Sequence, residues 1–336
     1  MTTLSSSPFS SSSQSSDPSV CDVTISIVSY NTSGPLRDCL QTLQDRRDEG
    51  EVTMEVVVAD NSSTDDSVAM VRREFPWVRV VETGGNIGYG RANNAGQENA
   101  RGRYAFILNS DTEVLPGALQ TMRDFMDANP KVGGVGAQLI LVDGSTQASC
   151  ARDPSLKAVW WEQTYLDKLF PKNTVTGNYL MTDWDYGTRR EVEQVCGACL
   201  FVRREAYTQI GGFDPAFFMY FEDTDFCIRL RRAGWPIWFI PEARIRHLLG
   251  ASSGNWRSRA RMIVSYNRSR YYYFTRYEGR LRGLAIKAMC ILGATMRSVA
   301  WHAIALVKPS ARDQARLFRK VWIDTVRMKP VGDAGE

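Results

Sequence analysis

The chain has 336 residues, of which 43% are hydrophobic, and its formal net charge is +4. These values are ordinary for a soluble protein with one large or two small domains. The seven cysteines are scattered, which excludes a disulfide framework and favours a reducing compartment. An uncharged apolar run of about 18 residues and a signal-peptide pattern are both missing, so we expect neither a transmembrane helix nor a leader.

Charged residues are distributed unevenly along the chain. From Arg244 onward, Lys and Arg outnumber Asp and Glu by about fourteen, so the preceding part is acidic by about ten. Such asymmetry indicates a basic end that contacts a polyanion or an anionic membrane surface.

The first half of the chain alternates between two kinds of pattern. Residues 1–20 are Ser-rich with almost no large apolar side chain, and we expect them to be disordered. β-Branched and apolar runs then alternate with runs of helical spacing, which indicates βαβ units and a mostly parallel sheet flanked by helices. Strands are expected at residues 23–29, 55–59, 78–81 and 104–109, and helices at residues 36–45, 67–75, 92–100 and 119–127.

The middle of the chain is less regular. Residues 143–190 carry several Trp and Tyr, which either fill the core or form a surface on which sugar or lipid stacks. Cys196 and Cys199 form a CGAC pair, but no second pair follows at zinc spacing, so we interpret them as structural. Further strands are expected at residues 132–141, 194–203, 237–240 and 243–247, and helices at residues 204–210 and 226–233.

Beyond residue 258, apolar residues recur at helical spacing from Leu284 to Leu306, and basic residues continue to Lys329. A basic amphipathic segment is typical of membrane-surface or partner contact, although it could also dock on the protein's own core. We favour the membrane because Trp301 and Trp322 suit an interface. The chain is thus divided into a tail (1–20), an α/β domain (21–257) and a basic helical region (258–336).

Polar residues follow the expected strands where those strands end. Asp111 follows the apolar run 104–109, and a carboxylate at that edge of a parallel sheet can hold a hard divalent cation. Asp60 ends the second strand and can accept a hydrogen bond from a base or a ribose. Both acids could instead cap the helices that follow them. Gly88 lies in a Gly-rich loop suited to close approach by a phosphate, but that loop lacks the G-x-G-x-x-G of dehydrogenases.

A second acidic cluster, Glu222-Asp223-Thr224-Asp225, precedes an expected helix. Asp225 suits the N-cap of that helix, which leaves Glu222 or Asp223 facing the cleft to take a proton from an attacking hydroxyl. His247 ends an expected strand, and a lone histidine at such a place is more often structural than a ligand.

An ordered set of segments carries a family resemblance over roughly residues 24–250. The segments ISIVSYN, VVVADNSSTD, GGNIGYGRANNAG, YAFILNSDTEV, CGACLFVRREAY and GGFDPAFFMYFEDTDFCIRLRRAGW together resemble glycosyltransferase family 2, and within it the rhamnosyltransferase branch. The resemblance implies the Rossmann-like GT-A fold and a dTDP- or UDP-sugar donor with Mg or Mn. It also implies inverting transfer of a deoxyhexose such as rhamnose to a lipid-linked or cell-surface glycan. The Q-x-x-R-W motif of processive members is absent, which favours one sugar per encounter.

The resemblance also implies roles for individual residues. Residues 109–111 match the family's D-x-D position, so Asp111 would bind the metal, and His247 matches a histidine that does so in some relatives. Asp223 matches the catalytic base of the family's E-D-x-D segment, and Glu222 lies beside it. The nucleotide-sugar contacts implied are Tyr30, Asn31, Asp60, Asn61, Asn86, Gly88, Arg91, Asn94 and Ser110.

Two other functions fit parts of the sequence. Nucleotidyl transfer to a sugar phosphate usually needs a Gly-rich basic loop after the first strand, and residues 30–35 hold no Lys or Arg. A non-catalytic basic protein that binds nucleic acid is disfavoured, because the convergent acids would repel phosphate without a cation. We therefore expect a cytoplasmic enzyme, peripheral on the inner face of the cell membrane, with no nucleic-acid partner.

Overall fold

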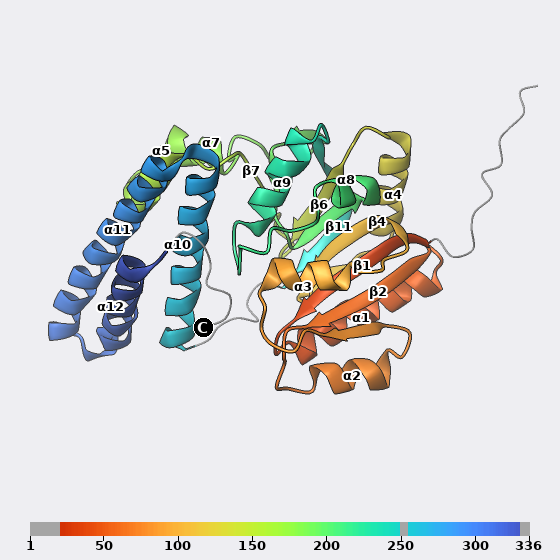
Figure 1. Ribbon diagram of the computed structural model, residues 1–336, viewed down its shortest axis with the longest axis horizontal. Coiled ribbons are helices and arrows are strands. Elements are labelled where there is room, and N and C mark those ends of the chain that lie inside the picture. Colours follow the sequence, from red (N-terminus) through yellow and green to blue (C-terminus); the bar gives the residue numbers. More distant parts are fainter. Residues whose placement is uncertain (1–20, 249–254, 330–336) are drawn as a thin grey trace, which may run out of the picture.

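A computed structural model describes residues 21–248 and 255–329, so the predicted disordered tail lies outside the described residues. Figure 1 shows two parts side by side: a twisted sheet covered by helices, and a bundle of long helices formed by the C-terminal residues. The helices are α1 (Ser33–Asp48), α2 (Ser67–Glu74), α3 (Tyr89–Gly96), α4 (Ala118–Ala128), α5 (Leu156–Gln163), α6 (Leu166–Leu169), α7 (Thr174–Tyr179), α8 (Arg204–Gln209), α9 (Glu222–Arg232), α10 (Trp256–Glu278), α11 (Arg280–Val307) and α12 (Arg312–Arg327), with a 3-10 turn at Pro309–Ala311.

Within the described residues, nine strands form one mixed sheet in the order β3-β2-β1-β4-β10-β6-β11-β5, with β8 paired to β11. The block from β3 to β4 is parallel, whereas β10 runs antiparallel between β4 and β6. The expected α/β fold is therefore confirmed. The strands are β1 (Cys21–Ser29), β2 (Met54–Asp60), β3 (Arg79–Glu82), β4 (Gly102–Asn109), β5 (Thr112–Val114), β6 (Gly134–Ile140), β8 (Arg190–Val192), β10 (Cys199–Arg203) and β11 (Ile237–His247), and β7 (Cys150–Ala151) pairs separately with β9 (Gln194–Val195).

Strand β4 is buried on both faces, which explains its continuous apolar run. Phe106 and Leu108 belong to the core cluster that also holds residues of α1, α2 and α4. Ala105 and Ile107 belong to the opposite cluster, with residues of α8 and α9. Because successive side chains of a strand point to opposite faces, β4 joins the two halves of the core.

Three sequence expectations need correction. Helix α9 begins at Glu222, four residues earlier than expected, so Asp225 lies inside its first turn and does not cap it. Asp225 is fully buried and binds Arg229 one turn later, with Nε to Oδ2 at 2.7 Å, and this i,i+4 pair favours a position inside the helix. Residues 237–247 form one strand, irregular between Ile240 and Arg244, and the expected strand 194–203 is broken between β9 and β10.

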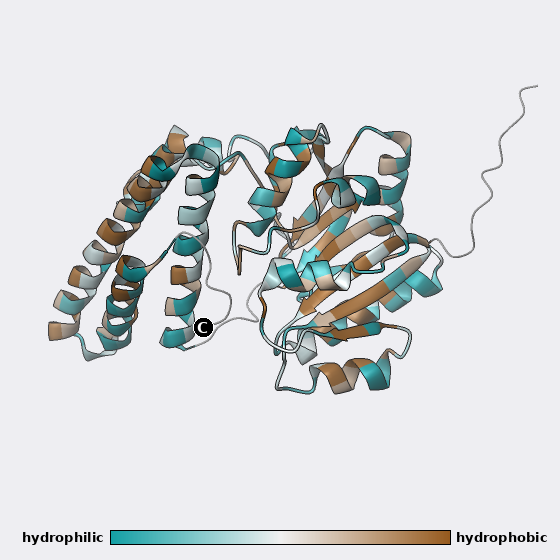
Figure 2. Ribbon diagram, viewed as in Figure 1, coloured by the Kyte–Doolittle hydropathy of each residue, from teal (hydrophilic) through white to brown (hydrophobic). Residues whose placement is uncertain are grey.

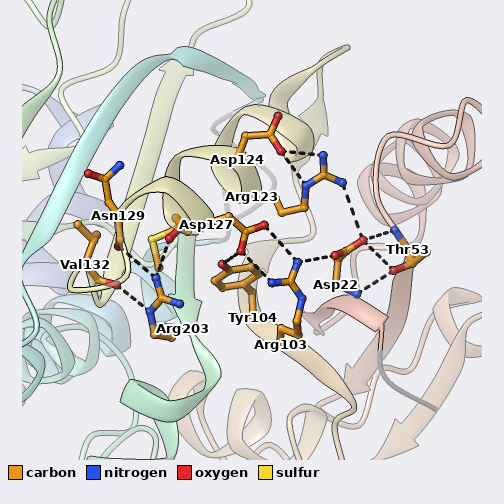
Figure 3. Close-up of polar contacts among 11 residues, drawn as sticks. Asp22, Thr53, Arg103, Tyr104, Arg123, Asp124, Asp127, Asn129, Val132 and Arg203 are labelled. Carbon is orange, nitrogen blue, oxygen red and sulfur yellow. Dashed lines mark hydrogen bonds and ion pairs between the residues drawn. The ribbon is translucent and has the colours of Figure 1, made fainter. Parts of the chain in front are cut away.

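An ion-pair network holds together the edge of the sheet where β1 and β4 begin (Figure 3). Arg103 donates to Asp22 at 2.7 Å and to Asp127 at 2.8 Å. The Tyr104 hydroxyl donates to Asp127 at 2.6 Å. Burial raises the pKa of Asp127, but hydrogen bonds from Arg103 and Tyr104 outweigh that effect and lower it below its ordinary value. The carboxylates at this edge are therefore kept ionised by their partners.

The C-terminal helices pack both on the domain and on one another. Tyr273 and Phe274 of α10 share a cluster with Phe217 and Phe221 of the α/β part, so α10 does dock on the protein's own core. Helix α11 is different, because only 17% of its most apolar window is buried. By length and composition alone, α11 is long and apolar enough to cross a membrane, whereas the sequence predicted no such helix. The sequence prediction required an uncharged run, and Lys287 and Arg297 interrupt this helix. Figure 2 shows the apolar residues along it.

Candidate functional site

The carboxyl ends of the parallel strands are aligned at one edge of the sheet. Ser29 lies opposite Asp60 in the register of β1 and β2, and Val28 lies opposite Asn109 in the register of β1 and β4. The loops that begin at Tyr30, Asn61 and Ser110 therefore leave the sheet together. This is the edge where open α/β sheets bind ligands.

Asp60 is 2% exposed, and its two oxygens differ in their surroundings. The Ser63 N–H donates to Oδ2 at 2.9 Å, whereas Oδ1 is buried with no hydrogen-bond partner among the described residues. Next to it, the Asn61 side chain donates to the Gly88 carbonyl at 3.3 Å. Since buried polar atoms are nearly always bonded, the free oxygen marks a place for a donor from a ligand.

Gly88 adopts a φ of 91°, and a Cβ there would lie 2.3 Å from the Phe218 carbonyl oxygen. A side chain at this position would therefore push apart α3 and the loop before α9. The Asn86 side chain accepts from the Gly88 N–H at 3.2 Å and shapes the same turn.

The loops after β1 and β2 are bonded to each other. The Asn31 side chain accepts from the Thr64 N–H at 2.7 Å, and the Asn31 N–H donates to Ser63 Oγ at 2.9 Å. The ring of Tyr30, half exposed, stands beside this junction and leaves an aromatic surface at the sheet edge.

Asp111 and His247 come together because β11 pairs with β5 in antiparallel register, with His247 opposite Thr112. His247 Nε2 lies 3.2 Å from Asp111 Oδ1, and the side-chain oxygen of Gln147 lies 2.8 Å from Nδ1. That oxygen favours the tautomer protonated on Nδ1, so the Nε2 lone pair faces the carboxylate.

This pair fits a divalent cation. Neighbouring ligands of one octahedral ion, each about 2.1 Å from it, lie about 3 Å apart, which is close to the observed separation. No group of three or more His, Cys, Asp or Glu with the geometry of a metal site occurs in the described part of the chain. A divalent cation held by two protein ligands can take its remaining ligands from water and substrate phosphates.

Asp223 lies in the first turn of α9 and is connected to the Asp111 loop through two residues. The Gly197 N–H donates to Asp223 Oδ2 at 2.9 Å. The Tyr89 hydroxyl lies 2.7 Å from the Gly197 carbonyl oxygen and 2.9 Å from Asn109 Oδ1. The two acidic clusters of the sequence thus lie at the same edge of the sheet. Burial raises the pKa of Asp223, which makes it a better proton acceptor than an ordinary carboxylate.

Glu222 is buried beside α3, and its Oε2 has no hydrogen-bond partner among the described residues. Burial, reinforced by the neighbouring Asp223, raises its pKa to about 8. Glu222 is therefore mostly protonated at neutral pH, whereas its neighbour is positioned by two backbone amides.

The remaining residues of the implied nucleotide set are Asn94, Arg91 and Ser110. Asn94 accepts from Tyr207 and from the Phe213 N–H, both at 2.8 Å, so it anchors the loop before α9. Arg91 donates to the Pro215 carbonyl of that same loop at 2.7 Å. Ser110 is buried at the turn after β4.

Sequence reasoning missed Tyr89, Gly197 and Gln147. Tyr89 and Gly197 stand inside the quoted GGNIGYGRANNAG and CGAC segments, but nothing local indicates that they meet. A Cβ on Gly197 would lie 3.4 Å from that of Asp223, which is an ordinary van der Waals contact. Burial raises the pKa of both CGAC thiols, Cys196 and Cys199, to about 12, which keeps them protonated and supports their structural interpretation.

Some aromatic residues of the region 143–190 pack in the core, and others remain exposed. Trp184 stacks on Tyr186 with ring centroids 4.4 Å apart, and both pack against Phe239 as core filler. Trp160 and Tyr165 remain 41% exposed on and next to α5.

The chain matches two family profiles. Residues 24–179 match "Glycosyl transferase family 2", and residues 104–308 match "Glycosyl transferase family group 2". The second match includes α10 and α11. The chain is 31% identical over 279 residues to the N-acetylglucosaminyl-diphospho-decaprenol L-rhamnosyltransferase of Mycobacterium tuberculosis strain H37Rv, covering 77% of this chain and 90% of the relative. It is also 33% identical over 144 residues to the succinoglycan biosynthesis protein ExoO of Rhizobium meliloti, covering 41% and 40% of the two chains.

Two solved structures share the fold. The mannosyltransferase PcManGT from Pyrobaculum calidifontis, in complex with GDP-Man and Mn²⁺, superposes with a TM-score of 0.52 at 16% identity, covering 92% of this chain and 86% of the other. GalNAc-T7 with UDP, GalNAc and Mn²⁺ superposes with a TM-score of 0.55 at 16% identity, covering 79% and 52%. The sheet topology, the family profiles and the rhamnosyltransferase relative agree, and this chain belongs to glycosyltransferase family 2 as a rhamnosyltransferase-like glycosyltransferase.

Proposed function

We propose that this glycosyltransferase moves a deoxyhexose such as rhamnose, with inversion, from a dTDP- or UDP-linked donor to a hydroxyl of a lipid-linked or cell-surface glycan. The observation that carries the proposal is the hydrogen-bonded connection from Asn109 through Tyr89 and Gly197 to Asp223, which brings a proton acceptor to the edge that holds Asp111. The M. tuberculosis relative, whose name states transfer of L-rhamnose to a diphospho-decaprenol-linked sugar, supports the donor and acceptor classes.

The donor nucleotide would bind across the ends of β1, β2 and β3. Asp60 Oδ1, free of other partners in the described residues, would accept from a base N–H or a ribose hydroxyl. The exposed ring of Tyr30 would stack on the base. The loop at Gly88 would let the diphosphate approach the backbone closely, with Asn31, Asn61, Asn86 and Ser110 around it.

Asp111 and His247 would hold a Mg or Mn ion, which neutralises the leaving diphosphate when it is bound. Gln147 would keep the His247 ring oriented for that task. The oxygen of the acceptor hydroxyl would attack the anomeric carbon on the side opposite the leaving group, and Asp223 would take the proton of that hydroxyl. The amides of Gly197 and Thr224 hold both Asp223 oxygens during that transfer.

The C-terminal region would hold the enzyme on the inner face of the cell membrane. Exposed apolar side chains of α11, such as Leu284, Val299 and Leu306, form a face suited to burial among lipid headgroups. Basic residues flank this helix at both ends, including Arg280, Arg282 and Lys308, and would contact anionic lipids. An enzyme placed there would meet a lipid-linked acceptor.

The test combines the purified protein, Mn²⁺ or Mg²⁺ and a panel of nucleotide-sugars, first as ligands that raise Tm and then as donors to a short polyprenyl-diphosphate-linked N-acetylglucosamine. We expect dTDP- or UDP-linked deoxyhexose to protect the protein and to give a product with inverted anomeric configuration. Conversion of a nucleotide-sugar and added pyrophosphate to a nucleoside triphosphate and a sugar 1-phosphate, without transfer to the acceptor, would indicate nucleotidyl transfer instead. Protection by no nucleotide-sugar at all would refute the donor assignment.

A further inference from the structure

Two cavities lie where the C-terminal helices meet the α/β part. The α7 cavity, about 410 Å³, lies between α5, α7 and α10 and includes Tyr179, Phe221 and Arg270 in its walls. The α12 cavity, about 480 Å³, lies between α10, α11 and α12. Glu162 and Tyr266 line both, so the two cavities adjoin. Figure 1 shows α5 alongside α11.

Both cavities reach the segment that carries Asp223. Tyr220 lines the α12 cavity and Phe221 lines the α7 cavity, immediately before the Glu222–Asp223 pair. These two residues have left-handed backbones, with φ of 68° and 64°, which is unusual for aromatic side chains. Because of this backbone turn, Tyr220 and Phe221 line different cavities although they are consecutive.

Tyr179 links the α7 cavity electrostatically to the same acid. Burial raises the pKa of Tyr179 first, and the Tyr266 hydroxyl and the Asp223 carboxylate raise it further, whereas Arg270 opposes them. Tyr179 therefore lies within electrostatic range of both Asp223 and Arg270. A molecule in the α7 cavity would contact Tyr179 and Arg270, with Phe221, two residues before Asp223, in the same wall.

Arg270 is 1% exposed but only partly paired. Its Nη2 lies 2.6 Å from Glu162 Oε2, and its guanidinium lies 4.5 Å from the centre of the Tyr266 ring. Nε and Nη1 are buried and have no hydrogen-bond partner among the described residues. If Arg270 served only to hold α5 on α10, the ion pair with Glu162 would still leave two buried donors unmet. Such donors suit the oxygens of a phosphate.

The α12 cavity has walls of a different kind. Met262, Ile263, Phe318 and Val321 contribute apolar surface to it. Arg297 also lines it, but its guanidinium already donates to Tyr165, Gln163 and the Glu162 carbonyl. This cavity therefore suits a hydrocarbon chain better than an anion.

We propose that the two cavities together form the acceptor site for a polyprenyl-diphosphate-linked sugar. Arg270 binds the diphosphate, the α12 cavity takes the first isoprenoid units, and the sugar extends along Tyr179 towards Asp223. The inference rests on the proposed function, because only an enzyme with a lipid-linked acceptor needs an anion site and an apolar site that adjoin beside its base.

The test measures binding of farnesyl diphosphate in mild detergent with EDTA, which removes cation-dependent binding at the donor edge. Farnesol supplies the chain without the anion, and inorganic pyrophosphate supplies the anion without the chain. We expect farnesyl diphosphate to bind more tightly than either, and Arg270→Gln to weaken it about tenfold or more by removing charge-assisted hydrogen bonds. Arg261→Gln, an exposed residue of the same helix that lines neither cavity, should bind as the wild type does.

Equal binding by the two Arg variants, or equal binding of farnesol and farnesyl diphosphate by the wild type, would overturn the assignment. If Arg270→Gln does not fold, a benzophenone-bearing farnesyl diphosphate can be crosslinked to the wild type instead. We expect labelled peptides from residues 154–182 and 259–270, and labels confined to the outer face of α11 would contradict the site.

Nucleotide-sugar protection separates this inference from the proposed function. Arg270→Gln should keep the rise in Tm caused by the donor and cation. Donor protection without any binding of farnesyl diphosphate would refute the acceptor site alone. Binding of farnesyl diphosphate that depends on Arg270, without protection by any nucleotide-sugar, would support the site and refute the donor assignment.

Discussion

The two edges of the central sheet use acidic residues in opposite ways. Where β1 and β4 begin, Asp22 and Asp127 are bonded to Arg103. Where the parallel strands end, Asp60 and Asp223 have no Lys or Arg within ion-pair distance in the described residues, and Asp111 faces only His247. Paired carboxylates stabilise a fold, whereas acids kept together without counter-ions are retained for a cation, a ligand or a proton.

Two buried oxygens where the parallel strands end also lack partners among the described residues. Asp60 Oδ1 and Glu222 Oε2 are hidden from solvent without partners in the part of the chain that the structure describes. An unsatisfied buried oxygen destabilises a fold by about 1–3 kcal/mol, and more if it is charged. Substitutions at the two edges should therefore separate activity from stability.

The largest effect is expected for Asp111→Ala. Loss of this carboxylate removes one of two protein groups suited to the cation, whose charge stabilisation is worth several kcal/mol. We expect turnover to fall by about 10³-fold or more, since about 1.4 kcal/mol corresponds to tenfold. Calorimetry should also show loss of cation-dependent nucleotide binding. Unchanged binding by the variant would remove Asp111 from the metal site.

Asp223→Asn should lower kcat by about 10²–10⁴-fold, the usual contribution of general-base catalysis. Nucleotide binding should be unchanged, because this residue lies on the acceptor side of the site. Asp127→Asn, the matched change at the opposite edge, should alter stability and leave kcat as it is. Near wild-type turnover by Asp223→Asn would exclude it as the base.

Glu222→Gln should change how stability depends on pH. The pKa of Glu222 rises from its ordinary 4.5 to about 8 in the folded protein, so unfolding releases a proton between these values. Its contribution to stability therefore falls as pH rises from about 4.5 to about 8. The variant lacks this titration, so its Tm relative to the wild type should increase from pH 5 to pH 8. A Tm difference that is the same at both pH values would contradict the raised pKa.

Tyr89→Phe removes the hydroxyl that contacts Asn109 and Gly197. One neutral hydrogen bond is worth about 0.5–1.5 kcal/mol, so we expect kcat to fall about two- to tenfold through misplacement of Asp223. The KM for the nucleotide-sugar should change little. A change confined to that KM would place Tyr89 in donor binding instead.

Arg103→Gln should have the smallest effect. The side chain of Arg103 is 44% exposed, so solvent screens its ion pairs. We therefore expect the free energy of unfolding to fall by about 1 kcal/mol. Urea denaturation would measure that loss, and kcat should not change. A large decrease in kcat would show that the two edges are coupled.

Local patterns predicted most of the donor half of the molecule. β-Branched runs, helical spacing and polar residues after strands are short-range features, and they placed Asp60 and Asp111 at strand ends. The prediction that Asp225 caps α9 was wrong because both oxygens of this carboxylate have other partners. Oδ2 pairs with Arg229 inside the helix, and Oδ1 accepts a hydrogen bond from Tyr277 in α10. The domain boundary at residue 257 remains a prediction, with α10 beginning at Trp256.

The sequence by itself determined most strands and helices of residues 21–128, the acidic strand ends and the basic C-terminal region, because each depends on neighbouring residues. Only the tertiary structure decided that His247 faces Asp111, that Gly197 and Tyr89 connect Asp223 to the Asp111 loop, and that Arg270 is buried with free donors. Those contacts join residues far apart in the chain. They depend on sheet register and helix packing, which no local pattern encodes.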